Sequence, residues 1–198
     1  MPKIGSLKMN EILTINTEDN LVEQKRVESL PLYDENYFML AEKLPEYSDP
    51  LPNPIIHNLA ERLKVTMKMY NGIGLSANQC GVAVRMFVLG YEEFSMTCIN
   101  PKVISTSAKA SLDNEGCLSF PGLYCKVARP EWVEVEYTTP SGEVNQTRLE
   151  GLTARCFLHE LDHMNGVKIT DHMGPVKLRM ARQKQLKRIK STKRKLKK

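Results

Sequence analysis

Long apolar runs are missing from this sequence. No stretch approaches the roughly 18 apolar residues that a membrane-spanning helix needs. The N-terminus lacks the charged flank and apolar core of a secretory signal, and the acidic residues between positions 11 and 23 are untypical of an organelle transit peptide. We therefore expect a cytoplasmic protein that does not interact with a membrane.

A disulfide framework is missing as well. The five cysteines are odd in number and scattered, at positions 80, 98, 117, 125 and 156. This distribution suits a reducing compartment rather than a small secreted scaffold. We interpret Cys80, Cys98 and Cys125 as small buried apolar residues, and we expect any cysteine with a special role to act as a thiolate.

Acidic residues are absent from residues 177–198, which hold 12 of the 28 Lys and Arg. Residues 1–176 therefore carry 16 basic and 23 acidic side chains, a formal charge of −7. Repeats are also absent, and 198 residues suit one domain with its own core. We divide the chain into a polar extension of uncertain order (1–35), a main domain (36–174) and a basic C-terminal helix or tail (175–198).

Apolar periodicity predicts two helices in the main domain. Asn53 and Pro54 form a capping pair, and apolar residues follow at helical spacing from Ile55 to Tyr70. A second helix is expected from about 152 to 164. Short apolar runs predict strands at 86–89 and 98–104, and alternation around a Pro-Ser-Gly turn predicts a hairpin at 133–149. The predicted fold class is α+β, with antiparallel strands packed around the central second helix.

That central helix carries HELDH at 159–163. Residues four apart lie on one face of a helix, so His159 and His163 can bind one ion beside Glu160. A bound divalent ion lowers the pKa of its water towards about 7 and so provides hydroxide at neutral pH. A catalytic site usually has three protein ligands and an open position for water, so a third ligand is expected elsewhere.

Three residues are candidates for the third ligand. Asp171 and His172 lie downstream, but the spacing of His172 fits the metzincin pattern poorly, and we interpret it as a surface residue. Cys117 lies upstream, in the otherwise polar turn DNEGCLSFPG, and is the better candidate.

Three separated stretches together resemble the motifs of peptide deformylases. They are GIGLSANQCG at 72–81, EGCLS at 115–119 and HELDH at 159–163, and the match extends over roughly residues 52–174. The resemblance implies that Cys117, His159 and His163 bind the metal. It also implies Fe(II), although a cysteine with two histidines also suits zinc, nickel or cobalt.

The resemblance also implies a reaction and its residues. The reaction is removal of the N-formyl group from the first methionine of a nascent chain, with release of formate. Glu160 is implied as the general acid and base. Gln79 and the backbone N–H of Leu118 are implied as oxyanion donors, and Glu115 is implied to pair with Arg129 as a structural brace.

A substrate pocket is expected beside the first motif. Gly72 and Gly74 would let a substrate backbone approach the main chain. Ile73, Leu152 and Cys156 are candidate walls for a methionine side chain, although core packing would explain these three residues equally well.

Three positions depart from the usual family pattern. Ser76 precedes Ala77 where Ala-Ala is usual, Leu158 replaces Gln, and Met164 replaces Leu. We expect these changes to alter local packing or pocket detail and to leave the chemistry intact.

Two other functions stay open from the sequence. An HExxH metalloprotease with a different third ligand would keep its metal when Cys117 is replaced. A zinc-stabilised RNA-binding protein would need a closed four-ligand shell, for which the sequence offers no well-spaced fourth Cys or His.

The basic tail has no role in the chemistry expected at HELDH. Leu178, Ala181, Leu186 and Ile189 give it a weak apolar strip at helical spacing. A solvated helix would explain this pattern, and so would a membrane-surface helix, although the tail has no aromatic anchor. Some bacterial deformylases carry a basic C-terminal helix that docks on the ribosome, so we expect contact with ribosomal RNA. We expect the protein to be a monomer.

Overall fold

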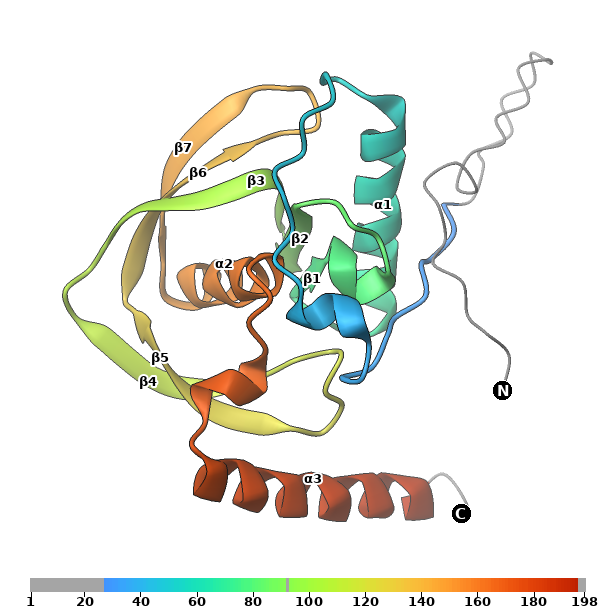
Figure 1. Ribbon diagram of the computed structural model, residues 1–198, viewed down its shortest axis with the longest axis vertical. Coiled ribbons are helices and arrows are strands. Elements are labelled where there is room, and N and C mark those ends of the chain that lie inside the picture. The colour runs from blue at the N-terminus through green and yellow to red at the C-terminus, as the bar shows by residue number, and fades with distance from the viewer. Residues whose placement is uncertain (1–26, 92, 196–198) are drawn as a thin grey trace.

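The computed structural model describes residues 27–91 and 93–195 (Figure 1). The α-helices of this region are α1 (Pro54–Met69), α2 (Gly151–Met164) and α3 (Pro175–Lys195). A five-stranded antiparallel sheet has the order β1 (Gly74–Ser76), β2 (Met86–Tyr91), β3 (Phe94–Thr106), β6 (Trp132–Thr138) and β7 (Val144–Glu150). A second antiparallel sheet pairs β4 (Ala110–Gly116) with β5 (Tyr124–Pro130). Within the described residues, three short 3-10 helices complete the fold: η2 (Phe38–Ala41), η3 (Ala77–Cys80) and η4 (Ile169–His172).

Strand β2 is buried on both faces. Successive side chains of a strand point to opposite sides of the sheet, so alternate residues of β2 pack in two different clusters. Met86 and Val88 pack in a cluster with α1, whereas Phe87 and Leu89 pack in a cluster with α2. Burial on both sides explains why this strand reads as an unbroken apolar run. The sheet therefore separates the two helices, with α2 at the centre of the molecule (Figure 1).

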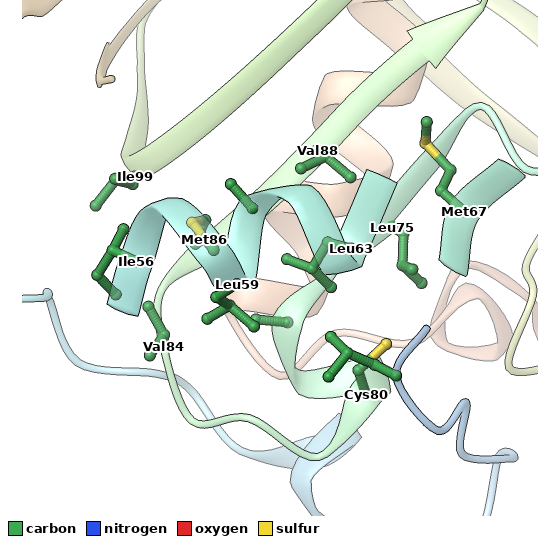
Figure 2. Close-up of a cluster of buried hydrophobic side chains, with 13 residues drawn as sticks. Ile56, Leu59, Leu63, Met67, Leu75, Cys80, Val84, Met86, Val88 and Ile99 are labelled. Carbon is green, nitrogen blue, oxygen red and sulfur yellow. The ribbon is translucent and has the colours of Figure 1, made fainter. Parts of the chain in front are cut away.

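Helix α1 covers one side of this sheet. The Asn53 side chain accepts a hydrogen bond of 2.9 Å from the Ile55 N–H, which confirms the predicted cap. The buried stripe begins at Ile56 rather than at Ile55, and Figure 2 shows Ile56 and Leu63 beside the β2 residues Met86 and Val88. This packing fixes the glycine-containing segment that follows α1.

The predicted α+β class, the two main-domain helices and the 133–149 hairpin are confirmed. Strands β4 and β5 were not predicted. The side chains of β4 are almost all exposed, so the sequence ASLDNEG shows no apolar alternation. Glu115 and Gly116 end this strand, and the turn expected around Cys117 begins only after them.

The N-terminal boundary also differs from the prediction. Leu30 is buried, and its N–H donates a hydrogen bond of 2.7 Å to Thr66 Oγ1 on α1. The Tyr33 N–H donates a bond of 2.9 Å to the Gln79 carbonyl. The packed body thus begins before residue 36, while residues 1–26 of the predicted extension lie outside the described residues.

Helix α3 confirms the predicted C-terminal helix, with one correction to its apolar strip. Leu178, Ala181 and Ile189 are partly buried, but Leu186 is 57% exposed. Gln185 occupies the buried position instead, because it shares a helical face with residues 178, 181 and 189. None of the helices in the described part of the chain is long and apolar enough to cross a membrane.

Candidate metal centre

One cysteine and two histidines converge beside α2. His159 and His163 lie on one face of this helix, and Cys117 lies in the turn after β4. One ligand atom from each residue falls within 4.8 Å of the others, and Cys117 Sγ is 3.2 Å from His163 Nε2. The structure therefore brings together the three residues that the sequence singled out as ligands.

Glu115 orients the first of these histidines. Its carboxylate lies 3.1 Å from His159 Nδ1 and accepts two bonds of 3.0 Å from Arg129, which confirms the expected Glu115–Arg129 pair. Arg155, which sequence reasoning missed, donates a further bond of 2.8 Å. Burial alone would raise the pKa of Glu115, but the hydrogen bonds from His159 and Arg129 hold it well below its usual range. An ionised Glu115 fixes the His159 ring with Nε2 free for a metal.

The two downstream candidates lie outside the cluster. His172 Nε2 bonds Asp162 Oδ2 at 2.8 Å, and Arg129 contacts the same carboxylate oxygen at 2.8 Å. Asp171 accepts a bond of 2.8 Å from the Lys168 N–H. His172 is thus an exposed surface residue, as predicted, and it also pairs with Asp162 of α2.

Gln79 lies next to the cluster on η3, and its amide is fixed at both ends. Its Oε1 accepts bonds from the Ser76 N–H at 3.0 Å and the Ser76 hydroxyl at 2.8 Å. Its Nε2 donates to Ser119 Oγ at 3.1 Å and towards Cys117 Sγ at 3.4 Å. The Ser76 hydroxyl therefore binds the side chain of Gln79, a specific contact that the expected change in packing or pocket detail did not include. The signal available was a serine three residues before a glutamine, the spacing of a capping box.

Glu160 is buried beneath the first motif, with only 3% of its surface exposed. A Cβ atom on Gly74 would lie 2.5 Å from Glu160 Oε1 and 2.7 Å from Cys156 Sγ, so this position requires glycine. Burial raises the pKa of Glu160 to about 7, and the neighbouring His159 opposes this effect. A carboxyl with such a pKa can both accept and donate a proton near neutral pH.

A cavity of about 630 Å³ opens above these residues. All four predicted substrate-binding residues line it: Ile73, Gly74, Leu152 and Cys156. Ile73 and Leu152 are 38% and 53% exposed and lie at the rim, whereas Cys156 is buried and contacts the Ile73 carbonyl. Leu118 also lines the cavity. Another wall consists of residues 120–124, which we call the wall segment and which sequence reasoning did not assign to the pocket.

The remaining cysteines are buried free thiols. Burial raises the pKa of Cys80 to about 12 and that of Cys125 to about 11, and it raises those of Cys98 and Cys156 well above the usual value. The predicted apolar roles of Cys80, Cys98 and Cys125 are consistent with this burial. Cys117 is the partly exposed cysteine of the set.

The residues present fit a divalent metal ion. A thiolate and two imidazoles form a donor set that suits zinc, iron and related metals. Among the described residues, Glu160 Oε2 is buried without a hydrogen-bond partner, as expected where a water or substrate atom binds beside a metal. The arrangement thus matches a three-ligand site with an open side facing the cavity.

Comparisons with known proteins point in the same direction. A family model described as polypeptide deformylase matches residues 33–179, which include all three motifs. The peptide deformylase of Thermotoga maritima is 39% identical over 124 residues, which cover 63% of this chain and 76% of that protein.

Solved structures agree with these sequence matches. The crystal structure of the Thermotoga maritima peptide deformylase has a TM-score of 0.71 at 31% identity, and the alignment covers 75% of this chain and 99% of that chain. A peptide deformylase from Synechococcus elongatus, in complex with actinonin, has a TM-score of 0.74 at 34% identity, covering 79% and 85%.

Proposed function

This chain belongs to the peptide deformylase family, and from that premise we propose how its residues remove the N-formyl group from the N-terminal methionine of nascent polypeptides. The observation that carries the proposal is the convergence of Cys117, His159 and His163 next to Glu160, at a cavity large enough for a peptide end. The two alternatives, a protease with another third ligand and an RNA-binding zinc protein, are not favoured, because neither accounts for all three motifs.

Cys117, His159 and His163 would hold one divalent ion. Such an ion, when bound, lowers the pKa of a water molecule and polarises a carbonyl oxygen. We propose Fe(II) as the physiological metal, with zinc, nickel or cobalt as alternatives that the same donor set accepts.

Glu160 is the proposed proton carrier. Hydrolysis adds water to the formyl carbon, breaks the C–N bond, and leaves formate and the free amine of methionine. The buried carboxylate of Glu160 accepts the proton that the water loses, and the resulting carboxyl donates it to the departing nitrogen. The pKa of about 7 supports both steps because neither protonation state is strongly disfavoured at neutral pH.

Gln79 and the backbone N–H of Leu118 are the proposed donors to the developing oxyanion. Ser76 holds the Gln79 carboxamide oxygen, so the amide NH₂ group is turned towards Cys117. Removal of one such donor typically costs about two to three powers of ten in rate. We further propose that the Gly74 main chain binds the peptide backbone and that Ile73, Leu152 and Cys156 surround the methionine side chain.

Formate release from a formyl-methionyl dipeptide tests this function. Protein purified without oxygen and loaded with Fe(II) should release formate and leave the internal peptide bond intact. Cleavage of an internal bond without formate release would instead support the protease alternative.

We also propose that α3 contacts ribosomal RNA. The protein would then act in the cytoplasm, as a monomer beside emerging nascent chains. The support is a row of exposed basic side chains on α3: Lys177, Arg179, Lys184, Lys187, Lys190 and Arg194. Contacts with phosphates weaken steeply as salt rises, because bound counterions are released. Replacing these residues by Gln should remove salt-sensitive co-sedimentation with ribosomes, and undiminished co-sedimentation would contradict the proposal.

A further inference from the structure

The basic helix α3 lies against the wall segment of the cavity. Figure 1 shows α3 crossing the molecule below the connection between β4 and β5. Gln185 Nε2 donates a hydrogen bond of 3.0 Å to the Pro121 carbonyl, and Arg188 Nη1 donates one of 3.0 Å to the Gly122 carbonyl. Two consecutive carbonyls of the wall segment are therefore bound by side chains from one face of α3.

Gln185 is built into this contact rather than resting on the surface. Only 6% of its surface is exposed, although it lies in a helix rich in Lys and Arg. Its Oε1 accepts a bond of 2.9 Å from Arg182 Nη1, which fixes the orientation of the amide and directs the NH₂ group to Pro121. A buried polar group with both ends bonded specifies one geometry of its surroundings.

The wall segment has a backbone shape that this contact can stabilise. Gly122 has φ +76°, a left-handed conformation that favours glycine. The side chains of Gln185, Arg188 and Ile189 lie 3.8–3.9 Å from the point that a Cβ atom would occupy at this residue. The Arg188 guanidinium lies over the Tyr124 ring, 4.8 Å from its centroid. The same face of α3 therefore covers the middle and the end of the segment.

The wall segment lies close in the sequence to Cys117, one of the three proposed metal ligands. The Phe120 N–H donates a bond of 3.0 Å to the Cys117 carbonyl, and the Leu123 N–H bonds the Phe120 carbonyl at 3.0 Å. All five residues of the segment line the cavity. Helix α3 also contacts the N-terminal segment, where Arg182 pairs with Glu35. Two residues before Glu35, the Tyr33 N–H donates a hydrogen bond to the Gln79 carbonyl.

We propose that α3 is a positioning element of the peptide-binding cavity, in which Gln185 and Arg188 hold the wall segment in the place that the substrate requires. The proposal rests on the deformylase function of the cavity. Neither residue lines the cavity or touches a metal ligand, so both act through the wall segment. Loss of either contact should loosen substrate binding more than it slows the chemical step.

Gln185→Met tests the proposal because methionine has a similar length but cannot donate a hydrogen bond. Gln183→Met is the matched control, since Gln183 lies on the same helix and is exposed. For formyl-methionyl peptides, Gln185→Met should raise KM about three- to tenfold, the loss expected for one hydrogen bond. Its kcat should stay within twofold and its metal content should equal that of the wild type, and Gln183→Met should match the wild type throughout.

Arg188→Met provides a second measurement at an exposed position, where the substitution does not threaten folding. It should also raise KM. The wild-type KM in both variants would overturn the proposal, and so would a fall in kcat and metal content with KM unchanged. Absence of formate release by the wild type itself would instead overturn the proposed function, which keeps the two failures distinguishable.

Discussion

The hydroxyl of Ser76 donates a hydrogen bond of 2.8 Å to Gln79 Oε1. The Ser76 N–H binds the same oxygen at 3.0 Å, so this carboxamide has two donors from one residue. A carboxamide can rotate its oxygen and nitrogen into each other's place, and the second donor disfavours that exchange.

Ser76→Ala should therefore lower kcat/KM about two- to tenfold, which corresponds to one neutral hydrogen bond, while the backbone N–H still holds Gln79. Steady-state rates and metal content should be measured together, and the metal content should not change. Unaltered kcat/KM would show that the backbone donor is sufficient on its own.

Glu160→Gln should keep the metal and lose at least two powers of ten in kcat, because proton transfer and metal binding are assigned to different residues. Metal analysis and formate release on the same sample make this comparison. Turnover within a few-fold of the wild type would require another proton carrier.

Cys117→Ala should lose metal affinity and activity together, since it removes one ligand of a three-ligand site. Titration with a competing chelator measures the affinity. A variant that binds metal as tightly as the wild type would point to a different third ligand and revive the protease alternative.

Alkylation should report on the metal site. In the metal-free protein, iodoacetamide should label Cys117, since the other four cysteines are buried and their thiols have raised pKa values. Added metal should protect Cys117 if it is a ligand. Peptide mapping by mass spectrometry identifies the labelled residue, and equal labelling with and without metal would contradict the assignment.

Local patterns were sufficient for much of the fold and for part of the site. The pair His159 and His163 could be predicted from the sequence, because residues four apart on a helix share a face whatever the tertiary structure. The α1 cap and the β6–β7 hairpin could also be predicted, because each depends on residues that are neighbours in the chain. The residue pattern alone only favoured Cys117 over Asp171 and His172, and the family resemblance was needed to assign it, because its distance from α2 in the sequence carries no geometric information.

Features that depend on tertiary contacts were missed. Strand β4 exposes most of its side chains, so it lacks the alternation that reveals a half-buried strand. Gln185 reads as one more polar residue of a basic tail, and its burial becomes apparent only when α3 is seen against the wall segment. Ser76 is a local exception, because the serine-to-glutamine spacing of a capping box was present in the sequence but was interpreted only as a change in packing or pocket detail.

The carboxylate of Glu115 has a consequence for how the protein acquires its metal. It contacts His159 from α2 and Arg129 from β5, so the imidazole is already immobilised when the chain folds. An ionised carboxylate at Nδ1 keeps a proton on that nitrogen, so the ring would lose its other proton from Nε2, the atom that would bind a metal. The folded protein thus holds the His159 ring in one orientation, and binding of a metal at Nε2 would require neither tautomer exchange nor ring rotation.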